Sequence, residues 1–308
     1  MRPSEKSNSS IYFSDIEGLT SNLAIAPSTY IEEAILTGAK VIVAEEIPSS
    51  LESSVTYIQV VNSSDALAFI ASNFYKNPSA EIKLIGVTGT NGKTTIVNLL
   101  YDLFILLGIR VGMLSTINNK INQNIISSTH TTPDAVQINF LLRRMIEEGC
   151  EYCFMEVSSH SVSQSRIKGL TFDAGVFTNI SHDHLDYHKN FNNYIKAKKL
   201  FFDLLPKSSF ALINNDDSNS IKITQGIKSE KVTYSLDKDS DYKCKIIEHD
   251  FDGMLLNIDK TDVWVRLVGR FNAYNMLCVY AIAHKFGLSE KRILTEISML
   301  NSPEGRFQ

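Results

Sequence analysis

The sequence contains no apolar stretch that approaches the roughly 20 residues needed to cross a bilayer. Its first residues, MRPSEKSNSSIYFSD, also lack the apolar core of a secretion signal. Positive charge is not in excess either, because 34 Asp and Glu outnumber 30 Lys and Arg and leave a net charge of -4. We therefore expect a cytoplasmic protein with no membrane insertion and no general affinity for nucleic acid.

Cysteine is scarce, with 4 in 308 residues. Cys150 and Cys153 form one C-x-x-C pair, but no second pair follows at the spacing of a zinc ribbon. This usage favours reduced, partly buried thiols over a metal site or a disulfide.

The chain is long enough for one large domain or two ordinary ones, and its pattern of elements changes near residue 79. Residues 1–79 contain a helical pattern over 28–37, the strand KVIVAEE and a further helix, which indicates a short α/β N-terminal domain. In residues 80–302 apolar strands alternate with helices, which predicts an α/β domain with a mostly parallel sheet wrapped by helices. Short strands from KVTYSL to VWVRLVG predict a small antiparallel part, and helices near 272–286 and 289–299 follow it.

The segment LIGVTGTNGKTT has the parts of a phosphate-binding loop. An apolar strand precedes Gly89 and Gly92, which permit close approach of the backbone to a phosphate, and a helical run begins at Thr94. Lys93 would place a charge on the outer phosphates, and the Thr94 hydroxyl would ligate Mg²⁺. Gly-Lys-Thr-Thr in this order favours a nucleotide site over a turn that binds nothing. Val87, however, stands where the usual G-x-x-x-x-G-K-[ST] pattern has its first glycine.

A second group of candidate residues follows the strand YCFMEVS. Glu156 ends this strand, at the place where a P-loop enzyme needs a carboxylate to share a metal ion with the loop threonine. The alternative is that Glu156 caps the next helix, which we expect near residues 161–168. Ser158, Gln164 and Arg166 offer a hydroxyl, an amide and a guanidinium that suit polar or anionic substrate groups.

Histidines and lysines concentrate in TNISHDHLDYHKNFNNYIKAKKLFF, residues 178–202. Three His and two Asp within seven residues could hold zinc on spacing alone. The absence of a nearby cysteine or second histidine cluster, together with the nucleotide loop, favours magnesium. Lys196, Lys198 and Lys199 would by themselves indicate a solvated helix face.

Six separated segments together resemble the Mur ligase family: GVTGTNGKTT, THTTPD, FMEVSSHSVSQSRI, NISHDHLDYH, YIKAKKLFFDLLP and GRFNAYNML. The resemblance runs from about Ile82 to Arg306, and within the family the segments resemble most the ligases that add the third amino acid. The family's own loop is T-G-T-N-G-K-T, so Val87 is no defect. The resemblance implies a central P-loop ATPase-like domain that joins meso-2,6-diaminopimelate or L-lysine to UDP-MurNAc-L-Ala-D-Glu in peptidoglycan precursor synthesis.

The resemblance also implies the chemistry and its metal ions. The D-glutamyl carboxylate attacks the γ-phosphate of ATP, and the incoming amine then displaces phosphate from the acyl phosphate to form an amide. Two Mg²⁺ ions would neutralise the crowded anions. Thr94 and Glu156 match ligands of the first ion, while Glu156, His184 and a carbamylated Lys198 match those of the second. The expected catalytic residues are Lys93, Glu156, His184 and Lys198.

Binding residues carry over from the matching motifs in the same way. Those expected to hold the UDP-sugar peptide are Thr131, Thr132, Ser158, Gln164 and Arg166. Those expected to hold ATP are Gly89, Thr90, Asn91, Gly92, Lys93, Thr94, Thr95, Asn272, Asn275 and Arg306. The i, i+3 spacing puts Asn272 and Asn275 on one helix face, although Asn272 alone could instead cap that helix.

The chain departs from the family pattern at both ends. It stops at SPEGRFQ, so residues 303–308 are expected to be the stub of a linker into an absent C-terminal domain. Residues 1–79 are expected to be a shortened form of the family's N-terminal UDP-substrate-binding domain, because they lack convincing matches to the segments that seat the UDP end. Four hypotheses remain open: an impaired tripeptide synthetase, a chain whose missing domain a separate polypeptide supplies, another Mur ligase or a folylpolyglutamate synthase, and a nucleotide-binding module without catalysis.

Overall fold

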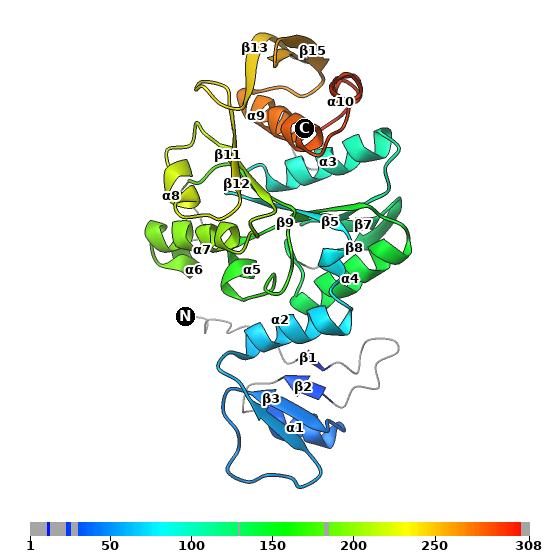
Figure 1. Cartoon of the computed structure of the whole chain (residues 1–308), viewed down its shortest axis with the longest axis vertical. Helices are drawn as coiled ribbons and strands as arrows, with labels where there is room; N and C mark the ends of the chain where they lie inside the picture. Colours follow the sequence, from blue (N-terminus) through cyan, green and yellow to red (C-terminus); the bar gives the residue numbers. More distant parts are fainter. Residues whose placement is uncertain (1–10, 13–22, 26–29, 129, 182–184, 303–308) are drawn as a thin grey trace. The chain divides into compact units, whose positions relative to one another are not determined.

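The chain forms two compact units, Met1–Ala71 and Ser72–Gln308 (Figure 1). This computed structural model describes residues 11–12, 23–25, 30–128, 130–181 and 185–302. The boundary falls inside helix α2 (Ser63–Phe74), earlier than the predicted boundary after residue 79. The Ser72 hydroxyl donates to the Gly169 carbonyl at 3.2 Å, and Arg143 Nε donates to the Tyr75 carbonyl at 3.0 Å. These bonds make the end of α2 part of the larger unit.

The smaller unit is an α/β structure with the sheet order β1-β2-β3-β4. Its elements are β1 (Ile11–Tyr12), β2 (Leu23–Ile25), α1 (Ile31–Leu36), β3 (Val41–Ala44) and β4 (Thr56–Gln59). Strands β1 and β2 pair antiparallel, and the other pairs are parallel. Ile31 and Ala34 of α1 form its core with Ile42 of β3. The predicted helix over 28–37 is therefore observed as α1, with residues 26–29 outside the described part.

The larger unit has a central sheet with helices on both faces (Figure 1). The strand order is β15-β14-β13-β12-β11-β10-β5-β9-β6-β7-β8. Strands from β13 to β6 in this order are parallel, and two antiparallel hairpins extend the sheet at its ends. The strands are β5 (Lys83–Thr88), β6 (Val111–Leu114), β7 (Asn118–Ile121), β8 (Asn124–Ser127), β9 (Tyr152–Glu156), β10 (Ala174–Phe177), β11 (Phe210–Asn214), β12 (Glu230–Ser235), β13 (Tyr242–Asp250), β14 (Gly253–Ile258) and β15 (Thr261–Val265). The predicted α/β class with a mostly parallel sheet and a small antiparallel part is confirmed.

Two apolar cores hold the helices against the sheet. One core contains α3 (Lys93–Leu106), α9 (Arg270–Lys285) and α10 (Glu290–Ile297). The other contains α4 (Ala135–Glu147), α5 (Ser159–Ser163), α7 (Phe191–Asp203) and α8 (Ser220–Thr224). A short helix α6 (Leu185–His188) and a 3₁₀ turn η3 (Pro78–Ala80) complete the described elements. A Cβ added to Gly86 would lie 2.5 Å from the Phe201 ring, so the glycine lets α7 pack closely on the sheet.

Three sequence-based expectations differ from the structure. The strand KVTYSL, expected in the antiparallel part, is β12, which pairs parallel with β11 on one side and with β13 on the other and so lies inside the sheet. The helix expected over 161–168 is α5, which begins earlier because the Ser158 hydroxyl caps it by accepting from the Ser161 N–H. The β7–β8 hairpin was not expected, since its turn at Asn122 and its polar strands give little periodic signal.

All four cysteines are free and buried, whereas the sequence predicts free and only partly buried thiols for Cys150 and Cys153. Burial raises the pKa of Cys150 to about 11. No helix in the described part of the chain is both long and apolar enough to cross a membrane.

Replacing Asp134 with Ala should lower the free energy of unfolding by about 1 kcal/mol. The Asp134 carboxylate caps α4 by accepting from the backbone N–H groups of Val136 and Gln137, at 2.9 Å each. Without it both donors lose their partner at the helix start. Urea unfolding measures the change, and Asp134→Asn, which keeps an acceptor, should cost less than half as much. Equal losses in the two variants would contradict the capping role.

Candidate active site

The glycine loop after β5 is tied to the segment after β10. The Thr178 hydroxyl donates to the Asn91 carbonyl at 2.6 Å, and the Thr90 N–H donates to the Asn179 carbonyl at 2.8 Å. A Cβ added to Gly89 would lie 1.9 Å from Thr178 Oγ1, so any side chain at this position would collide with the second segment. Two neighbouring parallel strands therefore hold the loop in place.

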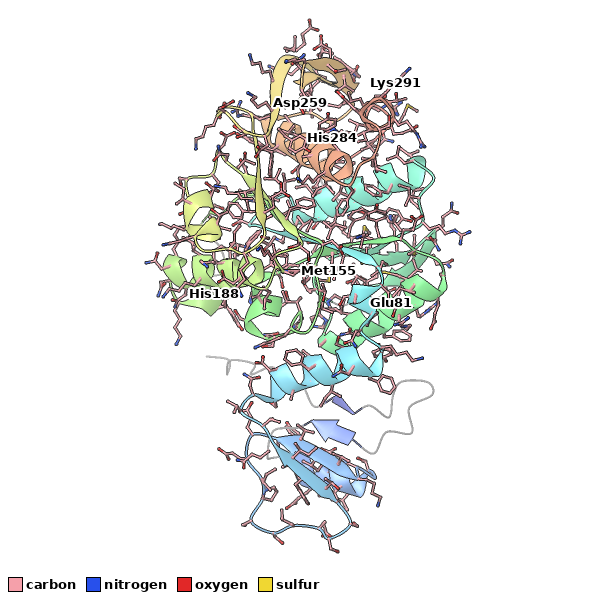
Figure 2. All side chains as sticks on the ribbon, in the orientation of Figure 1. Glu81, Met155, His188, Asp259, His284 and Lys291 are labelled. Carbon is pink, nitrogen blue, oxygen red and sulfur yellow. The ribbon has the colours of Figure 1, made fainter. Side chains whose placement is uncertain are left out.

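Glu156 lies at the end of β9 with its carboxylate fully buried. Its Oε2 accepts from the Thr94 hydroxyl at 3.0 Å and from the Thr116 hydroxyl at 3.2 Å, while Oε1 accepts from the Thr116 N–H at 2.8 Å. Burial raises the pKa of Glu156, and these donors together with the Lys93 charge partly oppose that shift. The alternative that Glu156 caps the next helix is wrong, because Ser158 is the cap. Met155, the residue before it, lies within the central sheet (Figure 2).

Two lysines converge on the loop. Lys93 Nζ donates to the carbonyls of Gly89 and Thr90, at 2.9 Å each, and Lys198 Nζ donates to the Gly89 carbonyl at 2.8 Å. Lys198 is 1% exposed and lies 4.6 Å from the centre of the Tyr194 ring. By contrast, Lys196 is exposed and Lys199 forms an ion pair with Asp203. Of the three lysines in α7 that the sequence analysis singled out, Lys198 alone therefore reaches the loop.

A cavity of about 350 Å³ opens on one side of the loop. Its described lining residues are Lys93, His130, Thr131, Thr132, Ser158, Ser159, His160, Gln164, Arg166, Tyr194 and Lys198. Arg166 is held there by donating to the Thr132 carbonyl at 2.8 Å and to Gln164 Oε1 at 2.9 Å. Burial lowers the pKa of Arg166. The described lining includes the basic side chains of Lys93, Arg166 and Lys198 and no carboxylate, so this cavity, the cationic cavity, suits an anion.

A larger cavity of about 550 Å³ opens on the other side of the loop. Its described lining residues are Asn91, Gly92, Thr95, Thr178, Asn179, Asn214, Asp216, Asp217, Tyr234, Phe271, Asn272, Tyr274, Asn275 and Ser302. Asn272 lies in the first turn of α9 and donates to the Val268 carbonyl at 2.9 Å; its Oδ1 accepts from Asn275 at 3.0 Å. The alternative that Asn272 caps α9 is wrong, because Gly269 occupies the cap position. The described lining of this cavity, the aromatic cavity, consists mainly of aromatic and amide side chains, includes the carboxylates of Asp216 and Asp217, and has no Lys, Arg or His.

Two of the predicted site residues, His184 and Arg306, lie outside the described residues. Reasoning from the sequence missed Thr116, which bonds Glu156 twice, and Asn179, which bonds the loop. Asn179 follows a strand at the carboxyl edge of the sheet and could have been found by that position. Thr116 also follows a strand, but RVGMLST gives no signal of its own.

The oxygen atoms of Glu156 and Thr94 are ligands that suit a hard cation such as Mg²⁺. The Thr94 hydroxyl directs its proton to Glu156, which leaves oxygen lone pairs for a metal ion next to a buried negative charge. No group of three His, Cys, Asp or Glu that could hold a metal exists among the residues placed in the structure. The His and Asp cluster for which the sequence leaves zinc open includes residues 182–184, which lie outside the described part of the chain.

The fold and the loop define the class: an α/β protein whose glycine-rich loop joins a parallel strand to a helix in the manner of nucleotide-binding proteins. A family model described as the Mur ligase middle domain matches residues 87–283. The chain therefore belongs to the Mur ligase family.

Individual relatives agree with this assignment. The chain is 50% identical over 279 residues to the UDP-N-acetylmuramoyl-L-alanyl-D-glutamate--2,6-diaminopimelate ligase of Phocaeicola vulgatus, covering 91% of this chain and 58% of the relative. A solved structure of a ligase with the same name superposes with a TM-score of 0.82 at 27% identity, over 93% of this chain and 61% of that one. The MurF ligase of Thermotoga maritima, solved in complex with ADP, shares the fold, with a TM-score of 0.62 at 17% identity over 93% of this chain and 65% of that one. The chain spans a little more than half the length of the curated relatives it matches.

Proposed function

We propose that this chain carries the ATP-binding and UDP-MurNAc-L-Ala-D-Glu-binding part of an ADP-forming ligase that adds meso-2,6-diaminopimelate in peptidoglycan precursor synthesis. The observation that carries the proposal is that the loop separates two cavities of different character, with Lys93 on the cationic side and Asn91, Gly92 and Thr95 on the aromatic side. A nucleotide whose phosphates cross the loop would place its base in one cavity and its terminal phosphate in the other. Such a precursor enzyme would work in the cytoplasm.

The aromatic cavity supports binding of the adenosine end. Asn272 and Asn275 lie on one face of α9 and present amide groups, while Phe271 and Tyr274 present ring surface. The N-terminus of α3 and the backbone N–H groups of the loop would face the phosphates, which need donors and positive potential.

The cationic cavity supports binding of the anionic substrate. Thr131, Thr132, Ser158, Gln164 and Arg166 converge there, although they come from two separate segments of the chain. Arg166 would orient a carboxylate by paired hydrogen bonds, and Lys93, which lines the same cavity, would contact both that group and a terminal phosphate. A carboxylate and a γ-phosphate held together in this way are the reactants of an acyl-phosphate ligase.

Thr94 and Glu156 would hold a Mg²⁺ ion, which supplies charge neutralisation between the phosphate oxygens. A second ion at Glu156, His184 and a carbamylated Lys198 remains a prediction. Support for it comes from the burial of Lys198 beside the loop, where an anionic lysine would suit a cation better than an ammonium. The choice of diaminopimelate over lysine rests on the names of the curated relatives.

Phosphate release by the purified 308-residue chain tests the proposal. The chain is incubated with Mg²⁺·ATP and UDP-MurNAc-L-Ala-D-Glu, with meso-diaminopimelate, with L-lysine, or with neither. We expect the chain to bind both ATP and the UDP-dipeptide. We also expect phosphate release to require the UDP-dipeptide. A matched Lys93→Ala variant should lose release by about a hundredfold or more, because it lacks the charge on the outer phosphates.

The outcomes distinguish the alternatives. Phosphate release that also depends on diaminopimelate and yields the tripeptide would show that this chain catalyses the whole ligation. Binding of both ligands with no release in any mixture identifies a nucleotide-binding remnant and contradicts catalysis by this chain. Binding of ATP without the UDP-dipeptide would instead favour a folylpolyglutamate synthase-like enzyme.

A further inference from the structure

We propose that Thr116 is a positioning residue that orients the Glu156 carboxylate for cation binding, an inference that rests on the proposed function. Thr116 follows β6, and β6 lies beside β9 in the sheet. Its N–H donates to Glu156 Oε1 at 2.8 Å, and its hydroxyl donates to Glu156 Oε2 at 3.2 Å. Because each carboxylate oxygen has its own donor from one residue, the plane of the carboxylate cannot rotate without breaking a bond.

The segment that carries Thr116 is itself held in a tight turn. The Ser115 hydroxyl donates to the Asn118 carbonyl at 2.7 Å, and Asn119 Oδ1 accepts from the Ser115 N–H at 3.3 Å. The Asn119 side chain is buried, so this turn is anchored in the core rather than in solvent. Thr116 therefore acts from a fixed support, which is what the orientation of a metal ligand requires.

The two threonines on Glu156 have different tasks. Thr94 belongs to the helix that follows the glycine loop, and its oxygen is a candidate metal ligand. Thr116 lies outside the described linings of both cavities, and its described hydrogen bonds go to Glu156. The contact of Thr116 with Glu156 thus fixes the carboxylate independently of any movement of the glycine loop after β5.

Manganese binding tests this role. Mn²⁺ is titrated into the 308-residue chain in the presence of ATP and followed by electron paramagnetic resonance, for wild type, Thr116→Val, Thr116→Ser and Ser127→Ala. Valine matches threonine in shape and keeps the backbone N–H bond to Glu156 Oε1, but its side chain cannot donate to Oε2. Thr116→Val should therefore bind Mn²⁺ about tenfold more weakly, as typical for loss of a group that orients a metal ligand. Thr116→Ser keeps the hydroxyl and should stay within about twofold of wild type. Ser127→Ala, an exposed change on the neighbouring hairpin, should have no effect.

A second readout separates positioning from general damage. Binding of ATP in EDTA should be unchanged in Thr116→Val, since the residue lies outside the described linings of both cavities. Equal Mn²⁺ affinity in wild type and Thr116→Val, or a serine variant as weak as the valine variant, would overturn the inference while the proposed function stands. If wild type itself binds no Mn²⁺ with ATP present, the proposed nucleotide–metal site fails and this inference fails with it.

Discussion

A Glu156→Gln variant should bind Mg²⁺·ATP at least about a hundredfold more weakly than wild type, since loss of an orienting partner alone typically costs about 10- to 100-fold. It should also unfold at a higher temperature when no ligand is present. The amide keeps the shape of the side chain: its oxygen can accept from the Thr116 N–H, and the Thr94 and Thr116 hydroxyls can rotate to accept from its nitrogen. What disappears is the negative charge.

The gain in stability follows from the sign of the pKa shift. The pKa of Glu156 is raised from 4.5 in the folded chain, chiefly by burial, so the folded state binds a proton more tightly than the unfolded state does. Above the raised pKa the ionised carboxylate destabilises the fold, and glutamine removes that cost. The difference in stability between variant and wild type should therefore be full above the raised pKa and vanish as the pH falls below the unfolded value near 4.5.

Calorimetric titration with Mg²⁺·ATP and thermal unfolding between pH 4 and pH 8 measure the two effects. Glu148→Gln is the matched control, because Glu148 forms an ion pair with Arg144 on the side of α4, where a lost charge should alter neither cation binding nor stability by much. A Glu156→Gln variant that binds Mg²⁺·ATP like wild type would show that Glu156 is not a metal ligand.

Replacing Gly89 with Ala should lower the free energy of unfolding by about 2 to 4 kcal/mol and remove detectable ATP binding. Its Cβ would meet Thr178 Oγ1 at 1.9 Å and the Asn179 backbone at 3.0 Å, so the loop has to move away from the segment that holds it. Movement there breaks the bond from Thr178 to the Asn91 carbonyl. Phosphate contacts would then be lost, since they need the loop backbone at a fixed place.

Urea unfolding and ATP titration follow the change. Gly108→Ala is the matched control, because Gly108 also has a positive φ, at 80°, yet no atom lies within 4 Å of its added Cβ. That variant should cost about 1 kcal/mol from backbone strain alone and keep ATP binding. If Gly89→Ala costs no more than Gly108→Ala, the collision with Thr178 does not matter and the loop is softer than its contacts indicate.

The main chemical parts of the site could be predicted from the sequence, for reasons that lie in the topology. Thr94 and Glu156 are 62 positions apart, but they follow β5 and end β9, which are adjacent parallel strands, so both reach the same edge of the sheet. Lys198 was chosen over its neighbours by resemblance, and its burial beside the loop has a plain cause, since α7 turns that face toward the sheet.

Other parts of the site could not be predicted. Thr116 can donate hydrogen bonds to Glu156 because β6 lies next to β9 in the sheet. No local sequence pattern encodes that strand order. The division of the site into two cavities depends on side chains from segments far apart in the chain, such as Asp216 and Asn275. The parallel pairing of β12 was missed because short strands look alike whichever way their partners run.

The glycine loop is a shared wall: Lys93 faces the cationic cavity, while Gly92 and Thr95, on either side of it, face the aromatic cavity. Contacts from the segment after β10 already hold this wall in place, so neither ligand has to order it on binding. The wall is therefore preorganised for the proposed nucleotide and for the proposed substrate, and each loses less conformational freedom than it would on a flexible loop.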